Sequence, residues 1–203
     1  DKIFVTYEAA DRIMDKPQPL PRVAGKKFLM YVGRATPHKN LARLVAAFEL
    51  LTQNHPDLYL VLAGKNDANY KKIGQLVTDR RLAHSVILAD HVSEAELRWL
   101  YEHTQAYIFP SLSEGFGLPA VEAMLHGAPV ICSKATSLPE VCDDAALYFD
   151  PMSTKDMAAQ IDKVLSNTGL RTNLIYKGKV RAARFSWKKM AEQTLKIYEA
   201  GLK

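Results

Sequence analysis

Several features are scarce or missing in this sequence. Its 203 residues include only two cysteines, Cys132 and Cys142, which argues against a disulfide framework and favours a reducing compartment. No apolar run approaches the ~20 residues of a membrane-spanning helix, and no His, Cys and carboxylate cluster has metal-ligand spacing. The chain opens with neither a basic start nor a cleavage site, so we expect no signal peptide. Together these absences predict a cytoplasmic protein without a metal site.

Charge is only mildly unbalanced. Lys and Arg total 27 against 22 Asp and Glu, and part of the excess lies between residues 171 and 189. A solvated helix face is the simplest explanation, and attraction to a nucleotide or to anionic lipid headgroups is the alternative. We therefore keep peripheral contact with the cytoplasmic face of a membrane open. A nucleic-acid partner is not expected, because no aromatic residues are interleaved with the basic ones.

The first 24 residues read as a connecting segment. A short β-like run, Ile3 to Val5, is followed by three prolines between Pro17 and Pro21. A proline-rich stretch is extended and semi-rigid, which is typical of a linker. We therefore divide the chain into an interdomain hinge, residues 1–24, and one domain with C-terminal helices, residues 25–203.

Within that domain, short apolar runs alternate with helical patterns. Such alternation predicts an α/β fold: a Rossmann-like, doubly wound parallel sheet of about six strands with helices on both faces. The expected strands are residues 27–32, 59–64, 86–88, 106–110, 129–132 and 146–149. Ligands of such sheets bind beyond the carboxyl ends of the strands. That rule selects the turns at residues 33–40, 64–67, 90–93 and 111–118. The first of them lacks the G-x-G-x-x-G fingerprint, which argues against a dinucleotide dehydrogenase.

The stretch from Ser111 to Ala123 is the most informative. It follows an apolar strand and contains a Gly-x-Gly turn, and Pro119 then opens a helix that Gly127 closes. A helix N-terminus carries unpaired N–H groups and partial positive charge, so it suits an anion. Two carboxylates bracket this position, Glu114 in the turn and Glu122 in the expected first helical turn.

Two cations stand in the turn after the first strand. Arg34 and Lys39 flank Pro37 and precede a helix. A guanidinium can bind two oxygens at once and an ammonium acts as a point charge, so the pair suits a diphosphate. On spacing alone, two ordinary surface charges explain the pattern equally well.

Taken together, the two turns resemble a known family. Glu114, the Gly-Phe-Gly-Leu-Pro run and a second glutamate eight positions later resemble the E-x7-E signature of GT4 (group 1) retaining glycosyltransferases. Gly33-Arg34 with Lys39-Asn40 is similar to that family's phosphate-clamping turn. The resemblance starts at about residue 25 and implies the C-terminal, donor-binding half of a GT-B fold, with the N-terminal domain absent.

The resemblance also implies roles for individual residues. Arg34, Lys39 and Glu114 become the catalytic candidates: the two cations would neutralise a leaving nucleoside diphosphate, and Glu114 would take hydroxyls of the donor sugar. Glu122 would bind the ribose. The remaining substrate-binding candidates are Gly33 in the phosphate-clamping turn, His91 and Val92 near the base, and Ser111, Gly115, Phe116, Gly117 and Leu118 around the sugar and phosphates.

The implied function is transfer of a hexose, mannose being one candidate, from a GDP- or UDP-hexose to an acceptor hydroxyl with retained configuration. The nucleotide sugar is the donor substrate, and no separate cofactor is expected. A sugar or lipid-linked acceptor would be held by the missing N-terminal domain, as in polysaccharide biosynthesis. A non-catalytic nucleotide-sugar-binding module is the alternative. A GT-B phosphorylase is disfavoured, because no lysine near the central turn suits pyridoxal phosphate.

Overall fold

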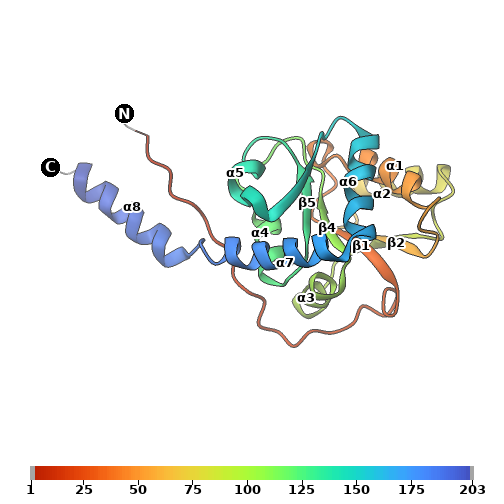
Figure 1. The fold of residues 1–203 in the computed structure, drawn as a ribbon, viewed down its shortest axis with the longest axis horizontal. Coiled ribbons are helices and arrows are strands. Elements are labelled where there is room, and N and C mark those ends of the chain that lie inside the picture. The colour runs from red at the N-terminus through yellow and green to blue at the C-terminus, as the bar shows by residue number, and fades with distance from the viewer. Residues whose placement is uncertain (1–2, 202–203) are drawn as a thin grey trace.

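A computed structural model describes residues 3–201. Its centre is a six-stranded parallel sheet in the order β3-β2-β1-β4-β5-β6 (Figure 1). The strands are β1 (Lys27–Val32), β2 (Leu58–Ala63), β3 (Val86–Ala89), β4 (Ala106–Phe109), β5 (Val130–Ser133) and β6 (Ala146–Phe149). The predicted doubly wound sheet is confirmed, and each predicted strand lies within a residue of the observed one.

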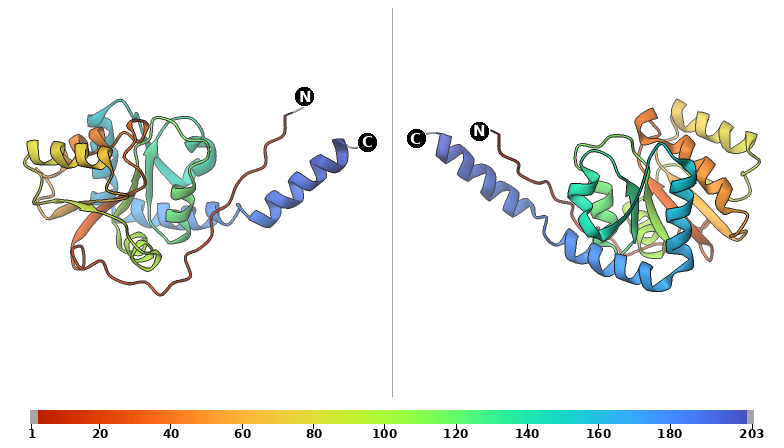
Figure 2. Two further views of the ribbon diagram at one scale, coloured as in Figure 1. Left: turned by 180° about the vertical axis from the view of Figure 1, so that it is seen from behind. Right: turned by 45° about the horizontal axis from the view of Figure 1, so that its top comes forward.

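The described residues also form eight α-helices. They are α1 (Leu41–Leu51), α2 (Ala68–Asp79), α3 (Glu94–His103), α4 (Leu118–Leu125), α5 (Leu138–Cys142), α6 (Thr154–Ser166), α7 (Thr168–Ala182) and α8 (Trp187–Gly201). Right-handed crossovers place α1 and α2 on one face and α3 and α4 on the other. Then α6 packs on α1, while α7 packs on α4 and on the β5–β6 side of the sheet (Figure 2). Two 3-10 turns, η1 (Pro37–Lys39) and η2 (Asp143–Ala145), complete the set.

Local sequence sets the starts of several helices. Ser93 and Glu96 form a capping box at the start of α3, each side chain accepting from the backbone N–H of the other residue. The Asp67 side chain accepts from two N–H groups at the start of α2, and Ser153 caps α6. These caps fix where each helix begins, and therefore the length of the loop that precedes it at the carboxyl edge of the sheet.

The core lies on both faces of the central strands. Every residue of β4 and β5 is buried, as expected of a parallel sheet covered by helices on both sides. Large side chains such as Phe28, Phe48 and Phe109 are almost fully enclosed. Burying one such side chain contributes about 1.5–3 kcal/mol, so the loops stand on a rigid platform.

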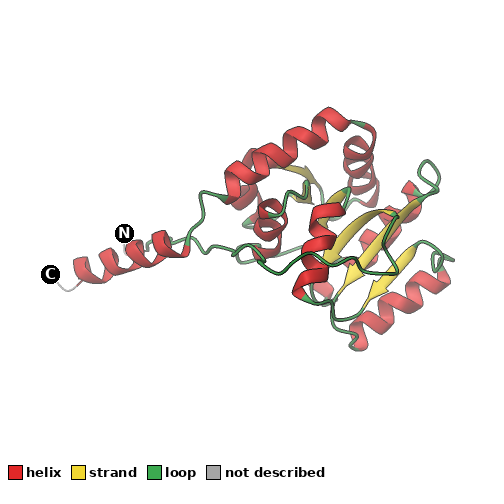
Figure 3. Cartoon of the chain, turned by 90° about the horizontal axis from the view of Figure 1, so that it is seen from below, coloured by secondary structure: helices red, strands yellow, loops and turns green. Residues whose placement is uncertain are grey.

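The two ends of the described chain differ from this body. Residues 3–5 form no strand and are exposed, so the β-like pattern of the sequence is misleading there. Further along the segment, Ile13, Leu20 and Val23 are buried against the domain. Helix α8 has no buried residue and extends away from the body beside the N-terminal segment (Figures 1 and 3). Within residues 3–201 no helix is long and apolar enough to cross a membrane.

Candidate functional site

The strand order places a topological switch point between β1 and β4. The chain leaves β1 toward β2 and leaves β4 toward β5, so the loops after these two strands diverge at the carboxyl edge. A crevice opens at such a point, and it is where ligands of doubly wound folds bind. The two loops are residues 33–40 and 110–117, the same two turns that carry the sequence motifs.

Asn40 joins these loops. It is buried and adopts a left-handed conformation (φ 61°), which asparagine tolerates better than most residues. Its Nδ2 donates to the carbonyl oxygens of Pro110 and Pro151, at 3.0 and 2.9 Å. The sequence pattern includes Asn40 in the turn motif but does not reveal that its side chain ties the loops together. A polar residue directly before an apolar helix was the available signal.

Lys39 and Glu114 meet across the crevice. The Lys39 Nζ lies 2.6 Å from Glu114 Oε1, although 75 positions separate the residues in the sequence. Their side chains are only 20% and 12% exposed, so solvent screens the pair less than a surface pair. The structure therefore brings two of the three catalytic candidates into direct contact.

Arg34, the third candidate, is exposed at the rim. Its guanidinium has no hydrogen bond or ion pair to any residue in the described part of the chain. Its carbonyl accepts from the Tyr31 hydroxyl at 2.8 Å, and the carbonyl of Gly33 accepts from the Tyr70 hydroxyl at 2.9 Å. Gly33 has φ 140°, and a Cβ there would lie 2.8 Å from the Tyr31 hydroxyl. Two tyrosines thus fix the backbone while the Arg34 side chain stays available.

The turn of residues 111–117 is held by the loop after β5. The Glu114 N–H donates to Thr136 Oγ1, and Ser137 Oγ donates to the carbonyl oxygens of Glu114 and Phe116. Gly117 then enters α4 at φ 107°, a value that favours glycine. At the start of α4, Pro119 has no N–H and the Ala120 N–H donates to the Gly117 carbonyl at 2.9 Å, so few free donors remain there. The dipole of α4 still places partial positive charge at this end, beside the crevice.

Glu122 does not lie in the first turn of its helix, as the sequence suggested. Helix α4 begins at Leu118, so Glu122 is in the second turn. It is half-buried and accepts from the Tyr101 hydroxyl of α3 at 3.2 Å. Burial raises the pKa of Glu122 above its ordinary value, and the nearby Glu94 carboxylate raises it further. Glu122 therefore faces the space between α3 and α4.

The predicted base site follows β3. His91 is exposed and Val92 is half-buried. The Asp90 carboxylate accepts from the Asn66 N–H at 3.0 Å, which ties this loop to the loop after β2. A small hollow of about 60 Å³ lies between them, lined by Gly64, Asn66, Tyr70, Leu88, Ala89 and Asp90. His91 and Val92 do not line it.

Two buried hydroxyls in the crevice loops lack partners. Ser111, which is fully buried, and Thr36 each have a side-chain oxygen that finds no hydrogen-bond partner among residues 3–201. Such orphaned groups are uncommon in folded proteins, because leaving a buried polar atom unsatisfied is costly. One lies in each of the loops that meet at the switch point.

Other reactive groups lie outside the crevice. Cys132 and Cys142 are free and buried, and burial raises the pKa of the Cys132 thiol. His126 accepts from the Ile13 N–H at 3.1 Å, and burial lowers its pKa. Among residues 3–201, no group of three or more His, Cys, Asp or Glu side chains could hold a metal ion.

The fold and its crevice define a Rossmann-like α/β domain with cations and a helix N-terminus at the switch point. The profile of the family described as Glycosyl transferases group 1 matches residues 13–181, and the chain belongs to this family.

Individual relatives are also glycosyltransferases or share the fold of this chain. The chain is 34% identical over 179 residues to the O-antigen chain mannosyltransferase B of Escherichia coli, covering 88% of this chain and 47% of that protein. It is similar to the solved sucrose-phosphate synthase of Thermosynechococcus elongatus, with a TM-score of 0.81 and 25% identity. That match covers 96% of this chain and 51% of the synthase. HepE of Anabaena, solved with UDP-glucose, shares the fold at a TM-score of 0.78 and 20% identity. That match covers 89% of this chain and 50% of HepE.

The chain therefore spans about half the length of the relatives it matches. The matched half is the C-terminal half of their GT-B architecture.

Proposed function

We propose that this chain is the donor-binding half of a retaining hexosyltransferase. It binds a nucleoside diphosphate sugar at the β1–β4 switch point and presents the sugar to an acceptor hydroxyl. The observation that carries the proposal is the Lys39–Glu114 pair, which joins the loop that holds the exposed Arg34 to the loop that leads into α4.

A sugar diphosphate offers a new partner to each member of that pair. Its diphosphate is an anion for Lys39, and its sugar hydroxyls are donors for the Glu114 carboxylate, which can only accept. No single small anion and no free sugar satisfies both. The unpartnered Ser111 and Thr36 hydroxyls add hydrogen-bonding capacity in the same loops.

In the proposed reaction, the bond between the anomeric carbon and the diphosphate oxygen breaks. The acceptor hydroxyl oxygen bonds to that carbon on the same face, and its proton passes to the departing phosphate oxygen. Charge grows on the diphosphate as it leaves. Arg34, Lys39 and the α4 N-terminus are placed to stabilise that charge, which is the largest contribution in many enzymes.

The remaining roles follow the family resemblance. We assign the ribose to Glu122, the base to the backbone of Val92 with His91 near its ring, and the phosphates and sugar to N–H groups between Gly115 and Leu118. Phe116 and Gly117 belong to that run, and Gly33 and Ser111 border it.

The donor and the domain boundary are further parts of the proposal. A relative at 34% identity is named a mannosyltransferase, which favours mannose and therefore GDP-mannose over a UDP-hexose. We assign residues 1–24 to the hinge and residues 25–203 to the donor domain. The acceptor would be held by a preceding domain, as the half-length match suggests.

The test is a calorimetric panel of GDP, UDP and ADP, each with and without its sugar, on residues 1–203. We expect binding of one nucleoside diphosphate, and loss of nucleotide affinity in Glu122→Gln with less effect on inorganic diphosphate. Equal losses for nucleotide and inorganic diphosphate would contradict the ribose assignment. Absence of binding by every nucleotide in the panel would overturn the proposed function.

A further inference from the structure

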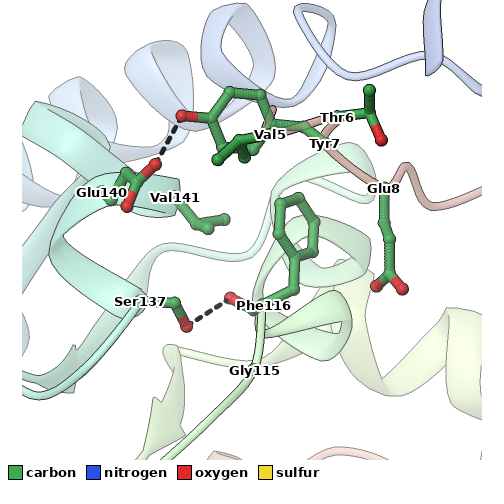
Figure 4. Close-up of a pocket in the computed structure, with 9 residues that line it drawn as sticks. All are labelled: Val5, Thr6, Tyr7, Glu8, Gly115, Phe116, Ser137, Glu140 and Val141. Carbon is green, nitrogen blue, oxygen red and sulfur yellow. Dashed lines mark hydrogen bonds between the residues drawn. The ribbon is translucent and has the colours of Figure 1, made fainter. Parts of the chain in front are cut away.

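A second hollow lies beside the crevice, on the side of the loop after β5. Its volume is about 430 Å³, within the range of ligand pockets. Three segments far apart in the sequence line it: residues 5–8 of the N-terminal segment, Gly115 and Phe116 of the central turn, and residues 137–141 at α5 (Figure 4).

Aromatic rings fix one wall of this pocket. Phe116 packs edge-on against Phe185, with ring centroids 5.3 Å apart, and Tyr7 contacts both rings at about 6 Å. The Phe116 side chain projects into the pocket between Val141 and Glu8 (Figure 4). Phe116 is only half-buried, so part of its ring offers apolar surface to the pocket.

Two carboxylates, those of Glu8 and Glu140, line the same pocket. The Tyr7 hydroxyl donates to the Glu140 carboxylate at 2.5 Å, and that hydrogen bond raises the pKa of Tyr7. Glu140 keeps a second oxygen free of this bond, and Glu8 contributes another carboxylate to the lining. Carboxylates accept from hydroxyl groups, often from two at once. An apolar ring face with carboxylates around it suits a pyranose, which has C–H groups on its faces and hydroxyls around its edge.

The pocket continues from the proposed donor-sugar site. Ser137 lines it and also donates to the carbonyl of Glu114, one residue before Gly115 in the lining. Thr136 holds the Glu114 N–H from the same loop. Along the sheet edge the diphosphate cations follow β1, Glu114 follows β4, and this pocket follows β5. Along this edge, the pocket therefore lies beyond Glu114 from the two cations that follow β1.

We propose that this pocket binds a hexopyranose unit of the acceptor, with Phe116 under the ring and Glu140 and Tyr7 at its hydroxyls. This assignment rests on the proposed function, because it takes Glu114 as the place of the donor sugar. The acceptor is then a saccharide, or carries one, and the donor half contributes to its recognition.

The test is saturation-transfer difference NMR on residues 1–203 with methyl hexopyranosides of mannose, glucose and galactose, each with and without GDP or UDP. We expect a saturation-transfer signal on at least one methyl hexoside. The variants Glu140→Gln and Tyr7→Phe should bind that hexoside about tenfold more weakly, as for loss of a charged hydrogen bond. Both positions are at the surface, and both variants should keep the nucleoside diphosphate affinity of the parent. Glu192→Gln removes the same charge from exposed α8 and should change neither affinity.

Three results would overturn the proposal. One is nucleotide binding without a saturation-transfer signal on any methyl hexoside, a result that does not contradict the proposed function. Another is hexoside binding that neither variant weakens. The third is displacement of the hexoside by the nucleotide sugar but not by the nucleotide, which would assign the pocket to the donor. Failure of every nucleotide to bind would instead reject the proposed function.

Discussion

At the scale of single residues, Lys39 is the group on which anion binding depends most. Of the two cations Arg34 and Lys39, only Lys39 is paired in the described structure, where its ammonium faces Glu114. We predict that Lys39→Ala weakens binding of the nucleoside diphosphate by about 1.5–3 kcal/mol, the scale for a charged hydrogen bond. Titration calorimetry measures this. An unchanged affinity would contradict the role assigned to Lys39.

Glu114 leads to different predictions for the free nucleoside diphosphate and for its sugar-bearing form. In the unliganded chain its carboxylate competes with any anion for Lys39, because the two groups are 2.6 Å apart. We predict that Glu114→Gln binds the free nucleoside diphosphate more tightly than the parent and discriminates less in favour of the sugar-bearing form. Parallel titrations with both ligands provide the comparison. Equal losses for the two would show that Glu114 does not compete.

The buried carboxylate of Glu122 predicts a pH dependence of stability. Because its pKa is raised in the folded chain, the folded state holds the proton over a range in which the unfolded state has lost it. The stability from this group is complete below about pH 4.5 and falls as pH rises through the raised value. Glu122→Gln should therefore gain in melting temperature relative to the parent between pH 4 and pH 8. A constant difference across that range would contradict the prediction.

At the scale of elements, the central turn depends on glycine at one position but not at its neighbour. A Cβ on Gly117, at φ 107°, would lie 2.7 Å from Leu138, whereas a Cβ on Gly115 meets nothing within 4 Å. We predict that Gly117→Ala costs about 1–3 kcal/mol of unfolding free energy, and that Gly115→Ala stays within about 0.5 kcal/mol. Denaturant unfolding of both variants measures these free energies. Equal unfolding free energies for the two variants would show that the turn is not strained at Gly117.

The strands could be predicted because each is a short apolar run bounded by polar or turn residues, and both sheet faces are covered. The β-like run at residues 3–5 misled because it has no strand beside it to pair with. Glu122 was placed one turn too early because a proline marks a helix start only to within a residue or two. The contact between Lys39 and Glu114, and the ties made by Asn40, depend on how the loops meet in three dimensions.

At the scale of the whole molecule, binding and transfer should separate. Residues 25–201 include a core large enough for independent folding, yet positioning the acceptor and excluding water need a second wall. We predict that residues 1–203 bind a nucleoside diphosphate in the micromolar to millimolar range, about 4–8 kcal/mol, without appreciable transfer. A radiolabelled donor provides the assay. Robust transfer by this chain alone would contradict the two-domain interpretation.

The pairing of Lys39 with Glu114 has a consequence for turnover. Under the proposed function, the intact donor engages both side chains, the diphosphate at Lys39 and the sugar hydroxyls at Glu114. Once the sugar has left, Glu114 loses its partners while the spent nucleotide still occupies Lys39. Re-forming the 2.6 Å ion pair then favours departure of the nucleotide. The same carboxylate that selects the loaded donor would thus speed release of the product, and clear the site for the next cycle.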